Sequence, residues 1–286
     1  NSSVVWHVES TINIPSIQLE QLLYEAIGYS FLKTPELHKA FLLIGEGRNG
    51  KSTYLDVIKA ICGAKNCTGL DFKDLGEKFR VGMLHNKLVS LSGDISSQPL
   101  KDSDLFKQIV GGDEITIEGK YDKPFKDAVF TTMMFSANTL PRTPDTTSGF
   151  YRRLCIIPFN ADLTKVSLVD GMDFKDRLMK DLEYIAYKSV LAISQVLKTT
   201  HTFIEPKCVT EMMKIYRIDN SGVLSWISAK NLDDTYIKSK TVEDLYAEYS
   251  VWCDVNNFKT VKSTRFETEV GMEFKVYKRG TMFVDK

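Results

Sequence analysis

The sequence predicts an α/β fold followed by a smaller helical domain, and three observations support this prediction. An apolar strand at 41–44 runs into a glycine-rich bend and then into a helix. Further short apolar or β-branched segments alternate with helical segments as far as about residue 199. From about residue 220 the pattern changes to helix, helix and hairpin. We therefore divide the chain into an N-terminal helical segment at 1–36, an α/β core at 37–205 and a C-terminal domain at 206–286.

The elements of the core can be placed in order from their patterns. Residues 16–32 carry helical apolar spacing, and TPELHKA is predicted to restart a helix with Thr34 as its cap and Pro35 in its first turn. The segment 87–94 is predicted to be a short buried strand that ends in an acid. A helix in SSQPLKDSDLFKQIV stops at Gly111-Gly112. A hairpin and a long buried strand then follow in EITIEGKYDKPFKDAVFTTMMFSAN, before a further strand and a long helical stretch at about 172–199.

The C-terminal domain has its own signals. TVEDLYAEYSVWCDVNN begins with a capping box formed by Thr241 and Asp244, and Thr264 and Glu267 stand in the same relation in the next helix. FKVYKRGTMFV alternates around Gly280 in the manner of a hairpin. Helix, helix and hairpin is the order of a winged-helix domain, and we predict that fold here.

Composition and charge limit the possible classes of protein. The 286 residues contain 37 Lys and Arg and 37 Asp and Glu, so the formal net charge is zero and any basic surface must be local. No apolar run approaches the roughly 20 residues of a membrane span, and we expect no signal peptide. The five cysteines are scattered, which favours reduced thiols over a zinc site. We expect a cytoplasmic protein without a membrane partner, and the absence of methionine at Asn1 suggests a fragment or a processed chain.

The bend after the first strand matches the pattern GxxxxGK[ST]. Three of the six residues at 45–50 are glycines, and Lys51-Ser52-Thr53 follow directly. Glycines at this density indicate that backbone, rather than side chains, approaches a ligand. In such a loop, amide N–H groups surround phosphate oxygens, the lysine reaches the β- and γ-phosphates, and the Ser52 hydroxyl binds Mg²⁺. The helix KSTYLDVIKAIC, ended by Gly63, directs its positive end at the same anion.

Two polar residues that follow predicted strands are candidates for ATP hydrolysis. Asp94, after LVSLSG, can hold Mg²⁺ through water, although SGDIS also suits a turn aspartate. Asn138, in FSANTLP, can orient the attacking water or sense the γ-phosphate, although an asparagine close to a proline also forms turns.

Basic residues stand out at two further places. Arg152 and Arg153 precede the strand of RRLCIIPF, where an arginine could stabilise charge on a phosphoryl group bound to a neighbouring subunit, or could simply lie at a solvated strand edge. In IEGKYDKPFK, lysines alternate with aromatic residues near a hairpin tip. This mixture suits single-stranded nucleic acid, and a solvated turn is the alternative.

Taken in order, these motifs resemble those of superfamily 3 helicases, in particular the helicase part of phage, plasmid-island and poxvirus-type primase-helicases. The order is GEGRNGKST, an acidic strand end, GGDEIT with KY and PF, FSANTLP and RRLCIIPF. The resemblance covers roughly residues 20–160 and is weaker through the C-terminal domain. It implies an AAA+ P-loop motor with three layers, a parallel central sheet and flanking helices. It also implies a ring, usually a hexamer, with ATP and Mg²⁺ bound between subunits.

The resemblance assigns roles to matching residues. Asp94 matches the Walker B acid and Asn138 the sensor asparagine. Arg152 or Arg153 matches the arginine finger that acts across the subunit interface, and we favour Arg152. The Walker A residues implied are Gly45, Gly47, Arg48, Asn49, Gly50, Lys51, Ser52 and Thr53, and those of the DNA-gripping hairpin are Lys120, Tyr121 and Lys123.

The resemblance also implies a function. The chain would be a replicative DNA helicase of a phage or mobile element that moves along single-stranded or forked DNA, with 3′ to 5′ polarity. A primase-polymerase domain would be expected upstream in the same polypeptide. Two other functions stay open. One is a nucleotide-gated DNA-binding scaffold that scarcely cleaves ATP. The other is a P-loop kinase of small molecules, which the segment GGDEITIEGKYDKPF between Asp94 and Asn138 disfavours.

One departure from the family pattern bears on these alternatives. Related proteins often carry two adjacent acids at Walker B, whereas here Gly93 precedes Asp94. Either Asp94 serves both tasks, or Asp113 or Glu114 contributes, or hydrolysis is slow.

Overall fold

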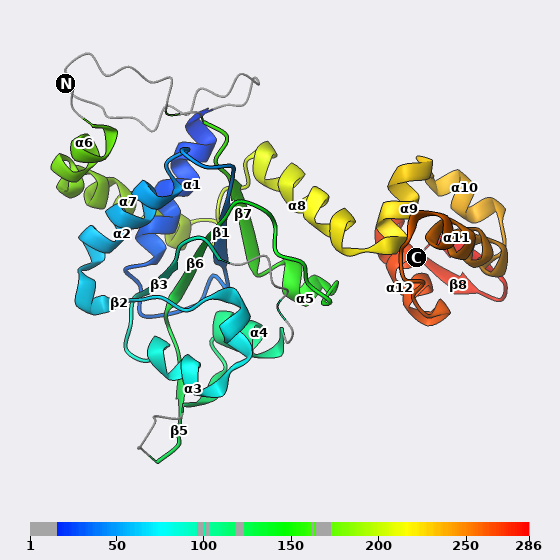
Figure 1. Ribbon diagram of the computed structural model, residues 1–286, viewed down its shortest axis with the longest axis horizontal. Coiled ribbons are helices and arrows are strands. Elements are labelled where there is room, and N and C mark those ends of the chain that lie inside the picture. Colours follow the sequence, from blue (N-terminus) through cyan, green and yellow to red (C-terminus); the bar gives the residue numbers. More distant parts are fainter. Residues whose placement is uncertain are drawn as a thin grey trace. The chain divides into compact units, whose positions relative to one another are not determined.

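A computed structural model describes residues 16–95, 100, 103–117, 123–161, 163 and 173–285. The chain divides into two compact units, Asn1–Met213 and Lys214–Lys286. The first unit has a parallel sheet between layers of helices, and the second has helices and a two-stranded sheet (Figure 1). The predicted α/β class is therefore confirmed. No helix in these described ranges is long and apolar enough to cross a membrane.

The centre of the first unit is a five-stranded sheet in the order β2–β3–β6–β1–β7, in which every neighbouring pair is parallel. Ile44, the last residue of β1, pairs with Ala137 at the end of β6 on one side and with Pro158 at the end of β7 on the other. The carboxyl ends of these strands therefore meet at one edge, which is where open α/β sheets bind ligands. The strands are β1 (Ala40–Ile44), β2 (Cys67–Thr68), β3 (Val89–Ser92), β6 (Thr132–Ala137) and β7 (Leu154–Pro158).

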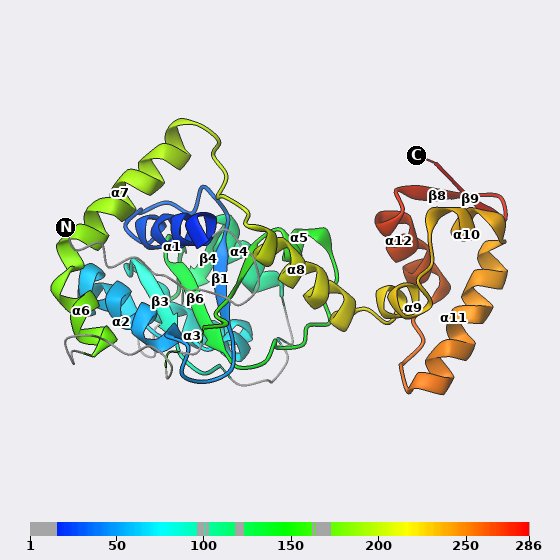
Figure 2. The ribbon, with the colours of Figure 1, turned by 90° about the horizontal axis from the view of Figure 1, so that it is seen from above.

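Helices bury one face of this sheet, as a parallel sheet requires. Phe41 and Leu43 contribute to a core shared with the helices α1 (Ser16–Tyr29), α2 (Lys51–Cys62) and α7 (Leu182–Lys198). α1 and α7 lie side by side (Figure 2). A Cβ atom at Gly28 would come within 2.3 Å of the Ser189 carbonyl oxygen, so this close approach requires glycine.

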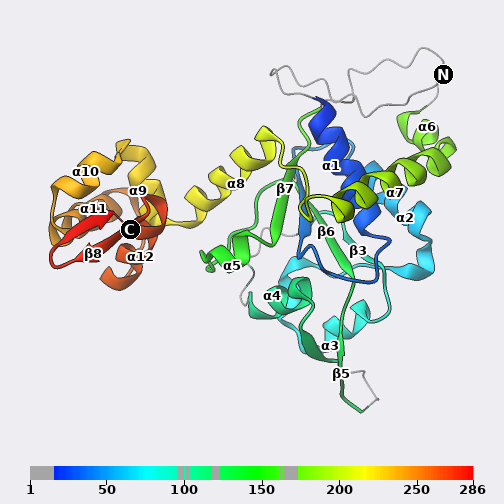
Figure 3. The ribbon, with the colours of Figure 1, turned by 180° about the vertical axis from the view of Figure 1, so that it is seen from behind.

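A chain of aromatic rings covers the opposite face. Phe135 on β6 lies 5.2 Å from Phe72 between ring centroids, and Phe72 lies 5.8 Å from Phe106. Phe106 in turn lies 5.3 Å from Phe150. Because Phe106 belongs to α4 (Asp104–Gly111) and Phe150 to α5 (Ser148–Tyr151), these contacts fix both helices to the sheet (Figure 3).

The predicted hairpin before β6 is confirmed. β4 (Glu114–Ile117) and β5 (Phe125–Ala128) are antiparallel, with Ile117 opposite Phe125. The remaining elements of the first unit are η1 (Ala64–Asn66), η2 (Phe72–Gly76), α3 (Lys78–Val81), η3 (Gly82–Leu84) and α6 (Phe174–Lys180). The helix α8 (Lys207–Asn220) begins in the first unit and ends in the second.

The second unit has its own aromatic core. The rings of Tyr249 and Phe266 stack with centroids 5.1 Å apart, and Trp226 lies 5.9 Å from Tyr249. The Thr241 hydroxyl accepts a hydrogen bond from the Asp244 amide and caps the helix α11 (Val242–Asn256), as its sequence predicts. The elements are α9 (Gly222–Lys230), α10 (Asp234–Ser239), α11 (Val242–Asn256), α12 (Ser263–Glu273), β8 (Val276–Arg279) and β9 (Met282–Asp285). β8 and β9 form the predicted hairpin, with Gly280 at φ 62° in its turn.

Two local predictions were wrong, and a third is refined by the structure. Residues 33–39 are not helical, because the chain turns there into β1, with His38 at φ 48° and Pro35 packed against Gly112. The helical stretch predicted at about 172–199 is present as α6 and α7, which are divided at Asp181, whose φ of −100° and ψ of 16° are not helical. α12 begins at Ser263 with Lys262 as its cap residue, so Thr264 lies inside the helix and does not cap it.

Candidate functional site

A tight loop joins the carboxyl end of β1 to α2. Gly50, the cap residue of α2, has φ 88°, and Arg48 has φ 62°. A Cβ atom at Gly45 would lie 2.2 Å from the Phe159 carbonyl oxygen and 2.3 Å from Asn49 Nδ2. The loop thus uses glycine both for its left-handed backbone and for close packing. Gly50 has no side chain to cap α2, and the first amides of a helix have no partner within the helix, so those of α2 are available to a ligand.

Lys51 is held inside this loop. Lys51 is only 4 % exposed, and its Nζ donates to the Gly45 carbonyl oxygen at 2.5 Å and to Asn49 Oδ1 at 3.0 Å. A longer contact of 3.4 Å reaches Asn138 Oδ1. All three acceptors are neutral. Burial lowers the pKa of the Lys51 ammonium, and the Asp94 carboxylate opposes this by raising it.

Asn49 holds the loop in shape. Asn49 is 6 % exposed, and its Nδ2 donates to the Phe159 carbonyl oxygen at 2.7 Å and to the Glu46 carbonyl oxygen at 2.5 Å. The same side chain accepts from Lys51 Nζ. The loop is therefore fastened to the segment after β7, a contact across 110 positions of sequence.

Two strands deliver polar side chains to the loop. Asp94 follows β3 and has φ 48°, a backbone region that aspartate adopts more readily than most residues. Its neighbour Ile95 donates its amide to the Ser136 carbonyl oxygen at 2.8 Å, which keeps the strand ends together. Asn138 directly follows β6. Both therefore lie at the edge of the sheet at which β1 ends.

These groups surround a cavity of about 550 Å³. An ammonium with neutral partners, amides at a helix N-terminus and a nearby hydroxyl form a site suited to a polyanion. Leu163, which no sequence signal identified, belongs to the lining because its amide donates to the Arg48 carbonyl oxygen at 3.2 Å. The lining consists of Gly47, Arg48, Asn49, Gly50, Lys51, Ser52, Thr53, Asp94, Asn138 and Leu163. Neither Asp113 nor Glu114 lines it.

A second cavity of about 550 Å³ also borders the loop. It shares Gly47, Arg48, Asn49 and Asn138 with the first, so the two spaces adjoin. Its own lining consists of Ile44, Gly45, Glu46, Phe159, Asn160, Ala161 and Met212. Met212, on α8, was not singled out by the sequence because nothing local links it to a loop more than 150 residues earlier.

The two arginines before β7 have different environments. Arg153 is half-buried, its Nη1 donates to the Gly149 carbonyl oxygen at 2.8 Å, and its buried Nε has no hydrogen-bond partner in the described residues. Burial and the neighbouring Arg152 lower the pKa of Arg153, while Asp113 raises it. Arg152 is exposed. Neither arginine lines the cavity beside Lys51 of its own chain.

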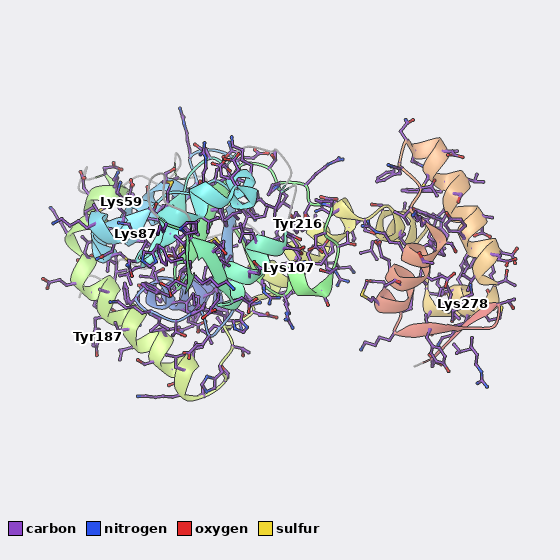
Figure 4. All side chains as sticks on the ribbon, turned by 90° about the horizontal axis from the view of Figure 1, so that it is seen from below. Lys59, Lys87, Lys107, Tyr187, Tyr216 and Lys278 are labelled. Carbon is purple, nitrogen blue, oxygen red and sulfur yellow. The ribbon has the colours of Figure 1, made fainter. Side chains whose placement is uncertain are left out.

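Asp145 fastens the loop that leads from Asn138 to these arginines. Its side chain is 8 % exposed and accepts from Ser103 Oγ, from the Thr147 amide at 2.9 Å and from Lys107 Nζ at 3.0 Å. Lys107 is on α4 (Figure 4). Burial alone would raise the pKa of Asp145, but these hydrogen bonds outweigh it and lower the pKa to about 2.

We expect Asp145→Asn to lower the free energy of unfolding at pH 7 by about 1.5–3 kcal/mol, the usual value of hydrogen bonds to a charged group. Because the pKa in the folded state is depressed, the stabilisation is present above the ordinary value of 3.8 and is lost as the pH falls toward 2. Denaturant titrations at pH 7, 4 and 3 should show the gap between wild type and variant closing. A gap that does not change with pH would mean that the carboxylate charge contributes nothing.

The hairpin β4–β5 is the predicted place for nucleic acid. Lys120 and Tyr121 lie outside the described residues. Lys123 is exposed just before β5. At the base of the hairpin, His85 lies 3.3 Å from an Asp127 carboxylate oxygen and 5.2 Å from Phe125 between ring centroids.

Comparison with known proteins gives a match of one segment to a family model and a likeness in fold to solved structures. Residues 43–153 match the model of a family of unknown function, DUF5906. No curated protein matches the sequence. Three apo structures of the C-terminal region of NrS-1 are similar, with 15 %, 16 % and 14 % identity and TM-scores of 0.50, 0.47 and 0.49. They cover 99 %, 99 % and 98 % of this chain, and 78 %, 77 % and 77 % of the NrS-1 chains. The likeness at a TM-score of 0.50 indicates a related fold.

Proposed function

We propose that this chain is a DNA helicase or translocase of a phage or mobile element, which assembles into a ring and hydrolyses ATP between subunits. One observation carries the proposal: the ammonium of Lys51 is buried among neutral acceptors in a glycine-rich loop, facing a cavity that Asp94 and Asn138 also line. A buried cation without a carboxylate in hydrogen-bond contact is costly unless an anion arrives. The phosphates of ATP are that anion.

The residues of the loop would each have a separate task. Lys51 contacts the β- and γ-phosphates, while the loop amides and the N-terminal end of α2 bind phosphate oxygens. Asn138, in contact with Lys51 Nζ, orients the attacking water toward the γ-phosphate. Arg152, exposed and outside the cavity of its own chain, stabilises the developing charge on ATP bound to a neighbouring subunit.

The oxygen ligands in the cavity fit Mg²⁺. The Ser52 hydroxyl and the Asp94 carboxylate line the same space, and both are hard oxygen donors. Mg²⁺ commonly takes only one or two protein ligands because it keeps waters and phosphate oxygens. When bound, it would neutralise charge on the transferred phosphoryl group.

Asp94→Asn is expected to reduce kcat for ATP hydrolysis at least 10²-fold and to raise the Mg²⁺ concentration needed for half-maximal rate. The measurement is ATP turnover across a Mg²⁺ titration. Glu114→Gln, on the exposed face of β4, serves as the control and should leave the rate unchanged. If Glu114→Gln lost activity and Asp94→Asn did not, the acid that holds the metal would be Glu114.

The scaffold alternative rests on Gly93, which stands where related helicases carry a second acid. A Cβ atom at Gly93 would meet nothing within 4 Å, so a larger side chain can be introduced there. If weak hydrolysis reflects the missing acid, Gly93→Glu should raise kcat. A small-molecule kinase is the less favoured alternative.

The decisive experiment is steady-state ATP hydrolysis with and without single-stranded DNA, with Lys51→Ala as the blank. Stimulation by DNA that is lost in the blank supports the motor. Robust hydrolysis that ignores DNA would overturn it in favour of a kinase. ATP binding and assembly without turnover would select the scaffold.

A further inference from the structure

The outer side of α11 is apolar and acidic. Val251 and Val255 stand one helical turn apart and are 64 % and 75 % exposed. Glu243, Ala247 and Asp254 are also exposed. At about 100° per residue, all five fall on about one third of the circumference of the helix. We call these five residues the α11 face.

This face carries negative charge without a counter-charge. α11 contains four acidic residues and no Lys or Arg. Glu243 and Asp254 form no ion pair within the described part of the chain. The opposite side of the helix is occupied, because Leu245 and Tyr249 are buried in the core of Lys214–Lys286. An exposed apolar patch with a polar rim is typical of protein interfaces, and acids repel the phosphates of nucleic acid. The α11 face therefore suits a protein surface that combines apolar residues with Lys or Arg.

The hairpin of β8 and β9 has one covered and one uncovered side. Val276 is buried in the core, and Lys278 Nζ lies 2.9 Å from a Glu267 carboxylate oxygen on α12. Because side chains alternate along a strand, Tyr277 and Arg279 lie on the other side of β8. That side faces away from the core.

The outer side of the hairpin combines apolar and basic residues. Tyr277 is 44 % exposed and pairs with Val284 across the hairpin, while Arg279 pairs with Met282. Arg279 and Lys275, which directly precedes β8, are exposed and form no ion pair with any residue that the structure describes. The hairpin face, defined as Lys275, Tyr277, Arg279, Met282 and Val284, thus has the composition that the α11 face requires.

We propose that the α11 face of one copy of this chain binds the hairpin face of a second copy. Both faces are exposed in the single chain, so neither covers the other within one copy. The contact would set Val251 and Val255 against Tyr277 and surround them with unlike charges. Because the two faces differ, the contact is head-to-tail and repeats from copy to copy. The inference rests on the proposed function only in taking copies of the chain to assemble, and it needs neither Lys51 nor Arg152.

Charge reversal in the full chain tests the contact. Glu243→Lys with Asp254→Lys, and separately Lys275→Glu with Arg279→Glu, should each weaken self-association at least about tenfold in sedimentation velocity without nucleotide, because like charges then face each other. An equal mixture of the two reversed proteins should associate as strongly as the wild type, since every contact again pairs unlike charges. Glu183→Lys is the matched control, because Glu183 is in the first turn of α7 as Glu243 is in that of α11, and it should associate as the wild type does.

A second pair of variants tests the apolar part of the contact. Val255→Ser should weaken self-association about five- to tenfold through the loss of buried apolar area. It should leave the midpoint of denaturant unfolding unchanged, because Val255 is exposed in the single chain. Leu191→Ser, which alters a side chain 49 % exposed on α7, is the control and should change neither quantity.

Three outcomes would count against the inference or the proposed function separately. No recovery in the mixture, or a wild type that stays monomeric at every concentration, would overturn the inference. Loss of duplex DNA binding in Lys275→Glu with Arg279→Glu, at unchanged self-association, would also overturn it, because the hairpin face would then be a DNA surface. Absence of ATP hydrolysis in a protein whose mixtures recover would overturn the proposed function alone.

Discussion

We expect Lys51→Ala to remove the proposed ATP hydrolysis and to weaken nucleotide binding by at least tenfold. The reason is that Lys51 Nζ is the buried positive charge of the cavity, and its partners Gly45, Asn49 and Asn138 are neutral and cannot replace it. Interactions of this kind with transferring phosphoryl groups are commonly worth several kcal/mol. Turnover and equilibrium binding of ATP measure the two effects separately.

The control for this variant is Lys59→Ala on the same helix, because Lys59 is exposed (Figure 4) and does not line either cavity. It should leave both quantities unchanged. Lys51→Met should not lower the free energy of unfolding by more than about 1 kcal/mol, because it removes a charge whose burial is unfavourable. Substantial unfolding of Lys51→Met would show that the lysine is a structural residue, and its loss of activity would then carry no weight.

We expect Arg152→Ala to lower kcat for ATP hydrolysis by at least 10²-fold in the proposed ring and to leave the affinity for ATP nearly unchanged. The expected size follows from arginines that act across subunit interfaces on transferring phosphoryl groups. Arg152 suits this role because it is exposed and absent from the cavity of its own chain. Arg153→Ala should instead lower the free energy of unfolding by about 1–3 kcal/mol, because Arg153 is half-buried and bonded to Gly149.

Mixing experiments separate action between subunits from action within one. Neither Lys51→Ala nor Arg152→Ala alone should hydrolyse ATP. In an equal mixture, roughly one quarter of head-to-tail interfaces combine an intact lysine with an intact arginine, so activity should return. No recovery in assemblies shown to contain both variants would contradict an arginine supplied by the neighbour. Arg142→Ala, which removes an exposed arginine from the preceding loop, is the matched control.

Much of the local structure could be predicted because it depends on short-range rules. The strand–loop–helix around Lys51 follows from glycine density and apolar spacing, and the end of α4 follows from Gly112, which has φ 77°. The same rules failed at Thr34 and Pro35, where helix-start signals are present but the chain must turn to enter β1. There, long-range packing against Gly112 outweighs local propensity.

The sequence by itself determined the α/β class, the glycine-rich loop and the residue types offered to a phosphate. Only the tertiary structure decided which of them meet. The strand order places β6 between β3 and β1, and this brings Asp94 and Asn138 to one cavity with Lys51. It also distinguished exposed Arg152 from half-buried Arg153, and it added Leu163 and Met212. Periodicity reports only which face of an element is buried, whereas strand order and burial depend on contacts between residues far apart in the chain.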